Sequence, residues 1–235
     1  MTDPTSAEIA PQGRLRAATI TVRVMRGVAE PLGAFIAERL GAAFEFVVFP
    51  NPQAYEQSFG APAWDIAIGP RLLAPADKAD LTADVWLVDL NYFAAAGRGF
   101  ANASEVDRPG VKVGTIQNSP SDRFLTRTLK SAALVRLPLS ENFPMDAIAL
   151  LRDGGADAFG ADCELIAAIA GGYPQGRIVP GAFTTVRAAV ALPKGRSAAA
   201  QARLAGLVAE AKRSGVVQQA IARAGLGHGV RVAPD

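Results

Sequence analysis

The chain has 235 residues, of which 50% are hydrophobic and 20% charged, a balance typical of a globular protein with one large or two small domains. Its 24 Lys and Arg residues and 22 Asp and Glu residues are interspersed and give a net charge of +2, which argues against nucleic acid or an anionic membrane as partner. A single cysteine, Cys163, makes an intrachain disulfide impossible. A zinc site or a Ser-His-Asp triad would depend on His228 alone, so we expect no metal and no cofactor.

Residues 1–15 are polar, and we expect them to be a disordered lead-in. They lack the basic and then apolar regions of a secretory signal, and no stretch of the chain is apolar for long enough to span a bilayer. As written, the sequence therefore predicts a cytoplasmic protein. A periplasmic protein is the alternative, if the start omits an export signal.

The main body of the chain alternates between β-prone and helical patterns. The expected strands cover residues 18–24, 44–49, 64–69, 84–96, 111–114, 133–139, 156–161 and 184–192. The expected helices cover residues 30–40, 53–59, 119–130, 145–151, 163–170 and 198–224, the last broken near Ser214 and Gly215. This alternation predicts an α/β fold with mostly parallel sheets flanked by helices.

Two of the expected strands, residues 84–96 and 184–192, are long and separate two sets of β-α-β units. We therefore predict two lobes joined by two crossing strands. Lobe 1 would take residues 16–92 plus 188–235, and lobe 2 residues 93–187. Open α/β sheets bind ligands outside the carboxyl ends of their strands, and two such lobes can close on a ligand by a hinge motion.

Four local patterns resemble those of a known family in the same order. They are VGTIQNS at residues 113–119, the D-A-…-G-x-x-D-A-x-x-x-D pattern over 146–162, AVALPKG at 189–195 and DIAIGP at 65–70. Together they resemble the type II periplasmic binding proteins, the solute receptors of ABC importers, over about residues 18–228. The resemblance implies a monomer that binds a small-molecule ligand without catalysis and has an ABC transporter membrane component as a further partner.

Lobe 2 supplies the strongest candidate site residues. A helix N-terminus attracts anions, and Asn118, Ser119 and Ser121 lie at the start of the helix expected after residue 118. The resemblance implies that Ser119 and Ser121 bind a ligand carboxylate and that Asp162 binds an ammonium group. The alternative is that Ser119 and Asp162 only cap their helices. Tyr92 would offer an aromatic wall or its hydroxyl, or else pack in the core.

Lobe 1 supplies weaker candidates at the ends of its first three expected strands. Arg26 could pair with an anionic ligand group, and Gly27 would let the backbone approach the ligand closely. Asn51 follows the second strand. Gly69 and Arg71 end the third, where Arg71 is a second candidate for anion contact. For the arginines a surface position is the alternative, and for Asn51 a turn.

The chain also departs from the amino-acid receptors of this family. Their T-x-x-R segment is replaced by APADK at residues 74–78, and Lys78 is no bidentate substitute for arginine. Tyr55 and residues 65–70 are similar to phosphonate- and other oxyanion-binding relatives. We expect a small anionic or zwitterionic ligand. The alternatives are a dehydratase of prephenate-like or chorismate-like acids, with Asp162 or Glu164 as its acid or base, and a cytoplasmic metabolite sensor.

Overall fold

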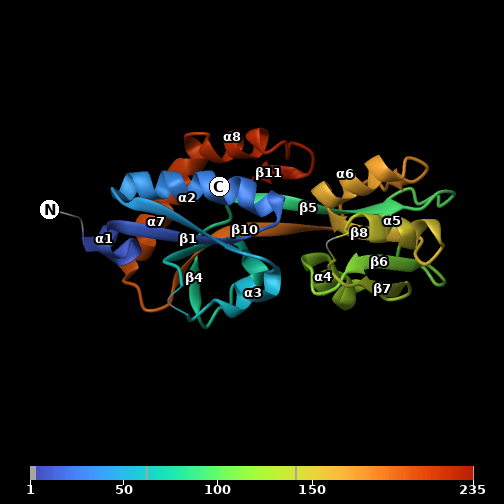
Figure 1. Ribbon diagram of the computed structural model, residues 1–235, viewed down its shortest axis with the longest axis horizontal. Helices are drawn as coiled ribbons and strands as arrows, with labels where there is room; N and C mark the ends of the chain where they lie inside the picture. Colours follow the sequence, from blue (N-terminus) through green and yellow to red (C-terminus); the bar gives the residue numbers. More distant parts are fainter. Residues whose placement is uncertain (1–3, 62, 141, 235) are drawn as a thin grey trace. The chain divides into compact units, whose positions relative to one another are not determined.

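The structure is a computed structural model that describes residues 4–61, 63–140 and 142–234, and it divides into two compact units. Unit 1 comprises Met1–Leu87 and Arg187–Asp235, and unit 2 comprises Val88–Val186 (Figure 1). Residues 88–92, which we assigned to lobe 1, fall in unit 2. Strands β5 (Trp86–Ala94) and β10 (Thr184–Pro193) each pass from one unit into the other.

Unit 1 is built on a sheet in the order β2-β1-β3-β10, in which β1 pairs in parallel with β2 and β3 and antiparallel β10 pairs with β3 and β4. Its strands are β1 (Arg14–Ile20), β2 (Ala43–Phe49), β3 (Ile66–Pro70), β4 (Ala79–Leu81) and β11 (Val230–Val232), with the start of β5 (Trp86–Ala94) and most of β10 (Thr184–Pro193). Its helices are α1 (Pro4–Ile9), α2 (Arg23–Leu40), α3 (Pro52–Gln57), α7 (Ala198–Arg213) and α8 (Val216–Arg223), with the 3-10 turns η1 (Pro11–Gly13) and η2 (Arg71–Leu73).

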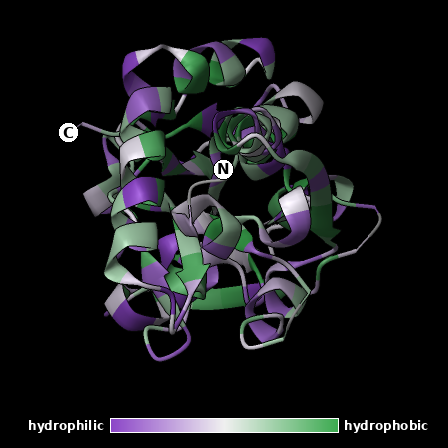
Figure 2. Ribbon diagram, turned by 90° about the vertical axis from the view of Figure 1, so that its left-hand side faces the viewer, coloured by the Kyte–Doolittle hydropathy of each residue, from purple (hydrophilic) through white to green (hydrophobic). Residues whose placement is uncertain are grey.

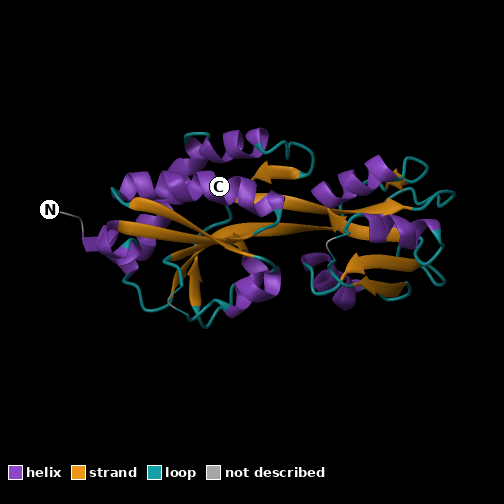
Figure 3. Cartoon of the chain, in the orientation of Figure 1, coloured by secondary structure: helices purple, strands orange, loops and turns teal. Residues whose placement is uncertain are grey.

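Unit 2 repeats the arrangement with the order β5-β8-β6-β7, in which β6 is parallel to β7 and β8 and β5 is antiparallel to β8 (Figure 3). Its own strands are β6 (Lys112–Ile116), β7 (Ala133–Leu137), β8 (Ala158–Asp162) and β9 (Arg177–Ile178). Its helices are α4 (Pro120–Thr128), α5 (Met145–Arg152) and α6 (Cys163–Gly172), with the 3-10 turn η3 (Ala103–Glu105). The predicted α/β class with mostly parallel sheets is therefore confirmed.

A buried aspartate locks the first and third strands of unit 1 together. The backbone N–H of Arg16 donates to Asp65 Oδ2 at 2.8 Å, and the N–H of Asp65 donates to the Arg16 carbonyl at 2.9 Å. Three residues farther along each strand, the hydroxyl of Thr19 donates to the carbonyl of Ile68 at 2.6 Å. The aspartate of the DIAIGP motif is therefore structural, because it fixes the register of β3 against β1.

The same lock occurs in unit 2. The N–H of Lys112 donates to Asp157 Oδ2 at 2.7 Å, and the N–H of Asp157 donates to the Lys112 carbonyl at 2.8 Å. Three residues on, the hydroxyl of Thr115 donates to the carbonyl of Gly160 at 3.0 Å. The chain thus contains a β-α-β-α-β unit twice, with β1, β2 and β3 equivalent to β6, β7 and β8.

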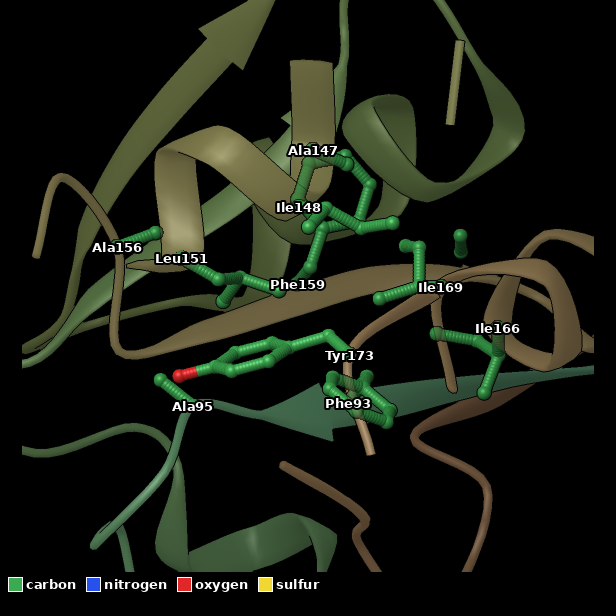
Figure 4. Close-up of a cluster of buried hydrophobic side chains, with 11 residues drawn as sticks. Phe93, Ala95, Ala147, Ile148, Leu151, Ala156, Phe159, Ile166, Ile169 and Tyr173 are labelled. Carbon is green, nitrogen blue, oxygen red and sulfur yellow. The ribbon is translucent and has the colours of Figure 1, made fainter. Parts of the chain in front are cut away.

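Side chains alternate between the two faces of the unit 2 sheet, as a period of two requires. On one face Phe93 and Phe159 pack with α5, α6 and Tyr173 in the cluster that Figure 4 shows. On the other face Tyr92 packs with Leu125 of α4. Helices on both faces explain why β8 is apolar up to its last residue, Asp162, and why the middle of β6 is buried.

The helices carry the complementary pattern of one apolar and one polar face. In Figure 2 the strands are mainly hydrophobic, whereas hydrophilic and hydrophobic residues alternate around the helices. In α7, Leu204 and Leu207 are buried and Arg203 is exposed. No helix of the described chain is long and apolar enough to cross a membrane.

The expectation of a disordered lead-in is wrong for the described residues from 4 onward. Residues Pro4–Ile9 form α1, and Ile9 is fully buried. Glu8 accepts hydrogen bonds from the backbone N–H and the hydroxyl of Ser197, the N-cap of α7. The segment is ordered by contacts with residues almost 190 positions away, which no local pattern reveals. Residues 1–3 lie outside the described part.

The first strand and the first long helix begin earlier than predicted. The strand covers Arg14–Ile20, and α2 starts at Arg23, inside the segment that we interpreted as strand and turn. The apolar residues Val24, Met25 and Val28 lie on the buried face of this helix. Packing against the rest of unit 1 thus overrides the strand preference of the β-branched residues.

Candidate functional site

The carboxyl edge of the unit 2 sheet brings two helix starts together. Strands β6 and β8 are parallel neighbours, with Val113 opposite Ala158 and Gly114 opposite Phe159. Both strands therefore end at the same edge, where Ser119 caps α4 and Asp162 caps α6. The edge thus carries a hydroxyl and a carboxylate, the donor and acceptor pair that we predicted for this lobe.

The start of α4 has a reciprocal cap. Ser119 Oγ accepts from the N–H of Asp122 at 3.1 Å, and Asp122 Oδ2 accepts from the N–H of Asn118 at 2.8 Å. Asn118 adopts a positive φ of 63°, and Ser121 is buried in the first turn of the helix. Because the carboxylate of Asp122 already lies in this turn, the helix N-terminus attracts a further anion less than an uncapped one would.

Asp122 lies in the polar turn that the sequence analysis identified at the start of this helix, but it was given no role there. Its other oxygen, Oδ1, accepts from Arg136 Nε at 2.8 Å and from the Thr126 hydroxyl at 3.1 Å. The S-x-x-D spacing of Ser119 and Asp122 is the signal that could have revealed it, since it is a variant of the capping box.

Asp162 is an N-cap, as the structural alternative proposed. Its Oδ1 accepts from the N–H of Leu165 at 3.0 Å. Burial raises the pKa of this carboxyl group, and hydrogen bonds from backbone N–H groups partly oppose the shift. Capping of Leu165 uses Oδ1, so capping and a ligand contact are compatible only when the two oxygens divide the two roles.

Tyr92 lies deeper in unit 2 than the two caps. In the sheet register it stands opposite Gly160, two residues before Asp162. Its ring stacks on Phe183 with centroids 4.4 Å apart, and the side chain is 3% exposed. Burial raises its pKa above the usual range. Tyr92 therefore packs in the core of unit 2, as the alternative interpretation proposed. Its position does not support the prediction that it forms an aromatic wall against a ligand.

In unit 1 the structure assigns Arg26 and Gly27 to helix α2 rather than to a turn after the first strand. Arg26 is exposed and lies 3.9 Å from Glu30 one helical turn away. A Cβ on Gly27 would lie 2.8 Å from Cβ of Ala224 at the end of α8. Gly27 is therefore needed for close packing of α2 against α8, which gives the glycine a structural reason that does not involve a ligand.

The ends of the second and third strands are also occupied by structural contacts. Asn51 caps α3 by accepting from the N–H of Ala54 at 2.8 Å. Arg71 donates to Asp84 Oδ1 at 2.8 Å and to the Thr82 carbonyl at 2.6 Å. Nε and Nη2 of Arg71 are thus bound within unit 1, and its role as an anion contact stays a prediction.

Gly69 lies on β3, directly against the ring of Tyr55. A Cβ at residue 69 would be 2.9 Å from the Tyr55 hydroxyl oxygen.

Among the described residues, no three His, Cys, Asp or Glu side chains are grouped so that they could hold a metal ion.

No family model and no curated protein matches this chain significantly. Solved structures do match over nearly its whole length. The solute receptor for L-cysteine of Neisseria gonorrhoeae is 16% identical, with 97% of this chain and 99% of that chain covered and a TM-score of 0.67. The GluR0 ligand-binding core in complex with L-glutamate is 14% identical, with 91% and 99% covered and a TM-score of 0.71.

A third similar structure is an ancestral amino-acid-binding protein described as a precursor of cyclohexadienyl dehydratase. It is 18% identical, with 93% of this chain and 98% of that chain covered and a TM-score of 0.67. Identities this low show a shared fold only. The duplicated β-α-β-α-β unit and the two crossing strands agree with that fold. The chain therefore has the fold of the type II periplasmic binding proteins, as the resemblance of its sequence motifs predicted.

Proposed function

We propose that this protein binds a small polar solute, as the solute-binding component of an ABC-type transport system. The observation that carries the proposal is the edge of unit 2, where Ser119 and Asp162 cap the helices that follow two adjacent parallel strands, β6 and β8. Ligands of open α/β sheets lie at such an edge. The similar structures support the class of function, since they are a receptor for L-cysteine, a ligand-binding core in complex with L-glutamate and an amino-acid-binding protein.

The chemistry of this edge favours a solute with a donor group and an acceptor group, such as a zwitterion. Asp162 would accept from an ammonium or another donor. The hydroxyl of Ser119 would donate to an oxygen of the solute. The candidate anion contacts of lobe 1 are not part of this proposal, because Arg71 is bound to Asp84 and Arg26 lies beside Glu30 on α2.

A thermal-shift screen of the pure protein tests the proposal. The panel holds amino acids, dicarboxylates, phosphonates, sulfonates and aromatic precursor acids. A solute at about 100 times its dissociation constant adds roughly 2.7 kcal/mol of stability and raises the melting midpoint by several degrees. If no class of compound shifts the midpoint, the binding proposal is wrong.

Two variants then test the location of the site. We expect Ser119→Ala and Asp162→Ala each to weaken binding of the compound that shifts the midpoint. Both also remove a helix cap, which costs about 1 kcal/mol. Ser197→Ala is the matched control, because Ser197 caps α7 of unit 1 with the same bond to the third residue of its helix, Ala200. Unchanged affinity in both site variants would place the solute elsewhere.

An enzyme on the same fold is the second candidate, and the raised pKa of Asp162 is the observation that favours it. A buried carboxyl group that retains its proton at higher pH can act as a general acid. Incubation with prephenate tests this reading. Turnover by the pure protein that is lost in Asp162→Asn would replace the binding proposal, and no turnover at micromolar protein would exclude prephenate as a substrate.

The protein that copurifies with this chain distinguishes a role in transport from a role as a metabolite sensor. We expect a membrane component of an ABC transporter to be retained by the tagged protein when membranes are solubilised in the presence of the bound solute. Retention of a soluble kinase or other cytoplasmic protein instead would favour the metabolite sensor.

A further inference from the structure

Tyr55 is held in place by an aromatic cluster in unit 1. It is the fourth residue of α3, and its side chain is 1% exposed. Its ring makes edge contacts with Phe49, at 6.1 Å between centroids, and with Phe59, at 5.3 Å. Phe59 in turn contacts Trp64 edge-on at 4.9 Å. Such contacts fix the orientation of the ring and hence the position of its hydroxyl.

The hydroxyl of Tyr55 lies at the carboxyl end of β3. It occupies the space that a Cβ on Gly69 would need, at 2.9 Å, and Gly69 is the residue before the last of that strand. A larger residue at this position would displace the tyrosine. The glycine that ends the DIAIG motif therefore gives the Tyr55 hydroxyl access to the edge of the sheet.

The other polar atoms of this cluster have partners within the chain. The indole N–H of Trp64 donates to Ser58 Oγ at 2.8 Å, and Ser58 Oγ donates to the backbone carbonyl of Tyr55 at 2.7 Å. The Tyr55 hydroxyl has no hydrogen bond to any residue within 4–61, 63–140 or 142–234. Within the described residues the fully buried side-chain polar atom without a partner is Trp86 Nε1, so the Tyr55 oxygen is not fully enclosed and its hydroxyl can donate to an acceptor outside the chain.

The position in unit 2 that is equivalent to Tyr55 carries a residue with a purely structural role. In α5, the equivalent of α3, the fourth residue is Ile148, which packs in the core of unit 2. Both helices carry alanine just before it, Ala54 and Ala147. An aliphatic side chain thus suffices to pack this helix against its sheet, and the hydroxyl is the feature that unit 1 adds.

The charges around this edge define what the hydroxyl can bind. Burial keeps the Tyr55 phenol protonated by raising its pKa above the usual range, so the group is a neutral donor. The nearby arginines are engaged within unit 1: Arg71 with Asp84, and Arg23 with the carbonyl of Ala224 at 2.7 Å. An acceptor oxygen at this edge would therefore be bound by a neutral group.

We propose that the Tyr55 hydroxyl is a specificity-determining donor that binds an acceptor oxygen of the solute, in place of the arginine that clamps carboxylates in amino-acid receptors. The oxygen belongs to a carboxylate, phosphonate or carbonyl group that is recognised by hydrogen bonds rather than by a guanidinium. This inference rests on the proposed solute-binding function and adds to it a hydrogen-bond donor at the carboxyl edge of the unit 1 sheet.

Isothermal titration of L-cysteine, L-glutamate, L-arginine and methylphosphonate into the wild type and two Tyr→Phe variants tests the proposal. Tyr55→Phe removes only the hydroxyl and keeps the ring contacts. Tyr173→Phe is the matched control, because the Tyr173 hydroxyl is satisfied within unit 2: it accepts from the N–H of Ala96 at 3.1 Å and lies beside Ala95 in Figure 4.

The two variants should show opposite patterns. We expect Tyr55→Phe to raise the dissociation constant of the bound probe about tenfold while its melting midpoint without probe stays equal or rises. Tyr173→Phe should lower the midpoint and leave the dissociation constant unchanged.

Two results would overturn the inference, and they are distinguishable. If a probe binds the wild type and binds Tyr55→Phe equally well, Tyr55 is not a contact and the proposed function stands. If none of the four probes binds the wild type in the millimolar range, a carboxylate or phosphonate solute is excluded, and the inference falls together with that form of the proposed function.

Discussion

The ion pair between Arg16 and Asp65 should be among the most stabilising polar contacts of unit 1. Arg16 Nη2 donates to Asp65 Oδ1 at 2.8 Å and Nε donates to Oδ2 at 3.1 Å, so the contact is bidentate. The Asp65 side chain is only 3% exposed, whereas that of Arg16 is 25% exposed. The side-chain hydrogen bond to Asp65 is the main cause that raises the pKa of Arg16. We therefore predict that Arg16→Met destabilises the protein strongly, since it leaves a buried carboxylate with backbone donors alone.

The magnitude follows from the two lost bonds. Removing one partner of a buried ion pair costs about 3–5 kcal/mol, because the remaining charge stays desolvated. In a chain of this size, 1 kcal/mol moves the melting midpoint by roughly 2–4 °C. Arg16→Met should therefore melt roughly 6–20 °C below the wild type.

Urea unfolding followed by tryptophan fluorescence and circular dichroism measures this loss. The matched control is Arg14→Met on the same strand, where Arg14 pairs with Glu45 at 3.0 Å but the two side chains are 53% and 44% exposed. Exposed pairs contribute at most about 1 kcal/mol. Adding Asp65→Leu to Arg16→Met should restore part of the loss by removing the unpaired carboxylate. Equal losses in Arg16→Met and Arg14→Met would refute the reasoning.

Three further predictions concern single side chains. Gly69→Ala should lower the free energy of unfolding by about 1–3 kcal/mol, because the new Cβ overlaps with the Tyr55 hydroxyl. The loss should be smaller in the Tyr55→Phe background, where the nearest remaining atom is Cζ at 3.1 Å. Equal losses in both backgrounds, measured by urea unfolding, would contradict this contact. Because burial raises the folded pKa of Asp162 above its ordinary 3.8, the folded chain binds this proton more tightly than the unfolded chain, and stability should fall as pH rises from 3.8 through the folded value. Asp162→Asn, which keeps the cap, should abolish that fall, and parallel pH profiles of the two proteins would contradict it. Burial raises the pKa of the Cys163 thiol to about 12, so Ellman's reagent at pH 8 should modify the native protein at least about tenfold more slowly than the protein in urea; equal rates would refute this.

The sequence by itself determined the order of the main strands and helices, although not α1 or the short strands β4, β9 and β11, because caps and breaks depend on neighbours along the chain. Ser119 followed by proline marks the start of α4. Gly215, with a φ of 80°, separates α7 from α8 at the predicted break. The caps at Asn51 and Asp162 could be read in the same way, since an N-cap bonds to a backbone group three residues on.

Only the tertiary structure decided which candidate side chains have partners of their own. Arg71 and Asp84 are 13 residues apart, and Gly27 packs against Ala224 near the other end of the chain. Local patterns cannot choose among distant partners, so exposed and engaged arginines look alike in the sequence.

The same reason explains the errors in unit 1. Residues 23–29 have strand-like composition, yet burial of their apolar side chains makes them the first turns of α2. The hydroxyl of Tyr55 reaches Gly69 only because β3 lies beside α3 in the folded unit. Helix caps and breaks are encoded locally, whereas the partner of each polar side chain is set by packing between segments far apart in the sequence.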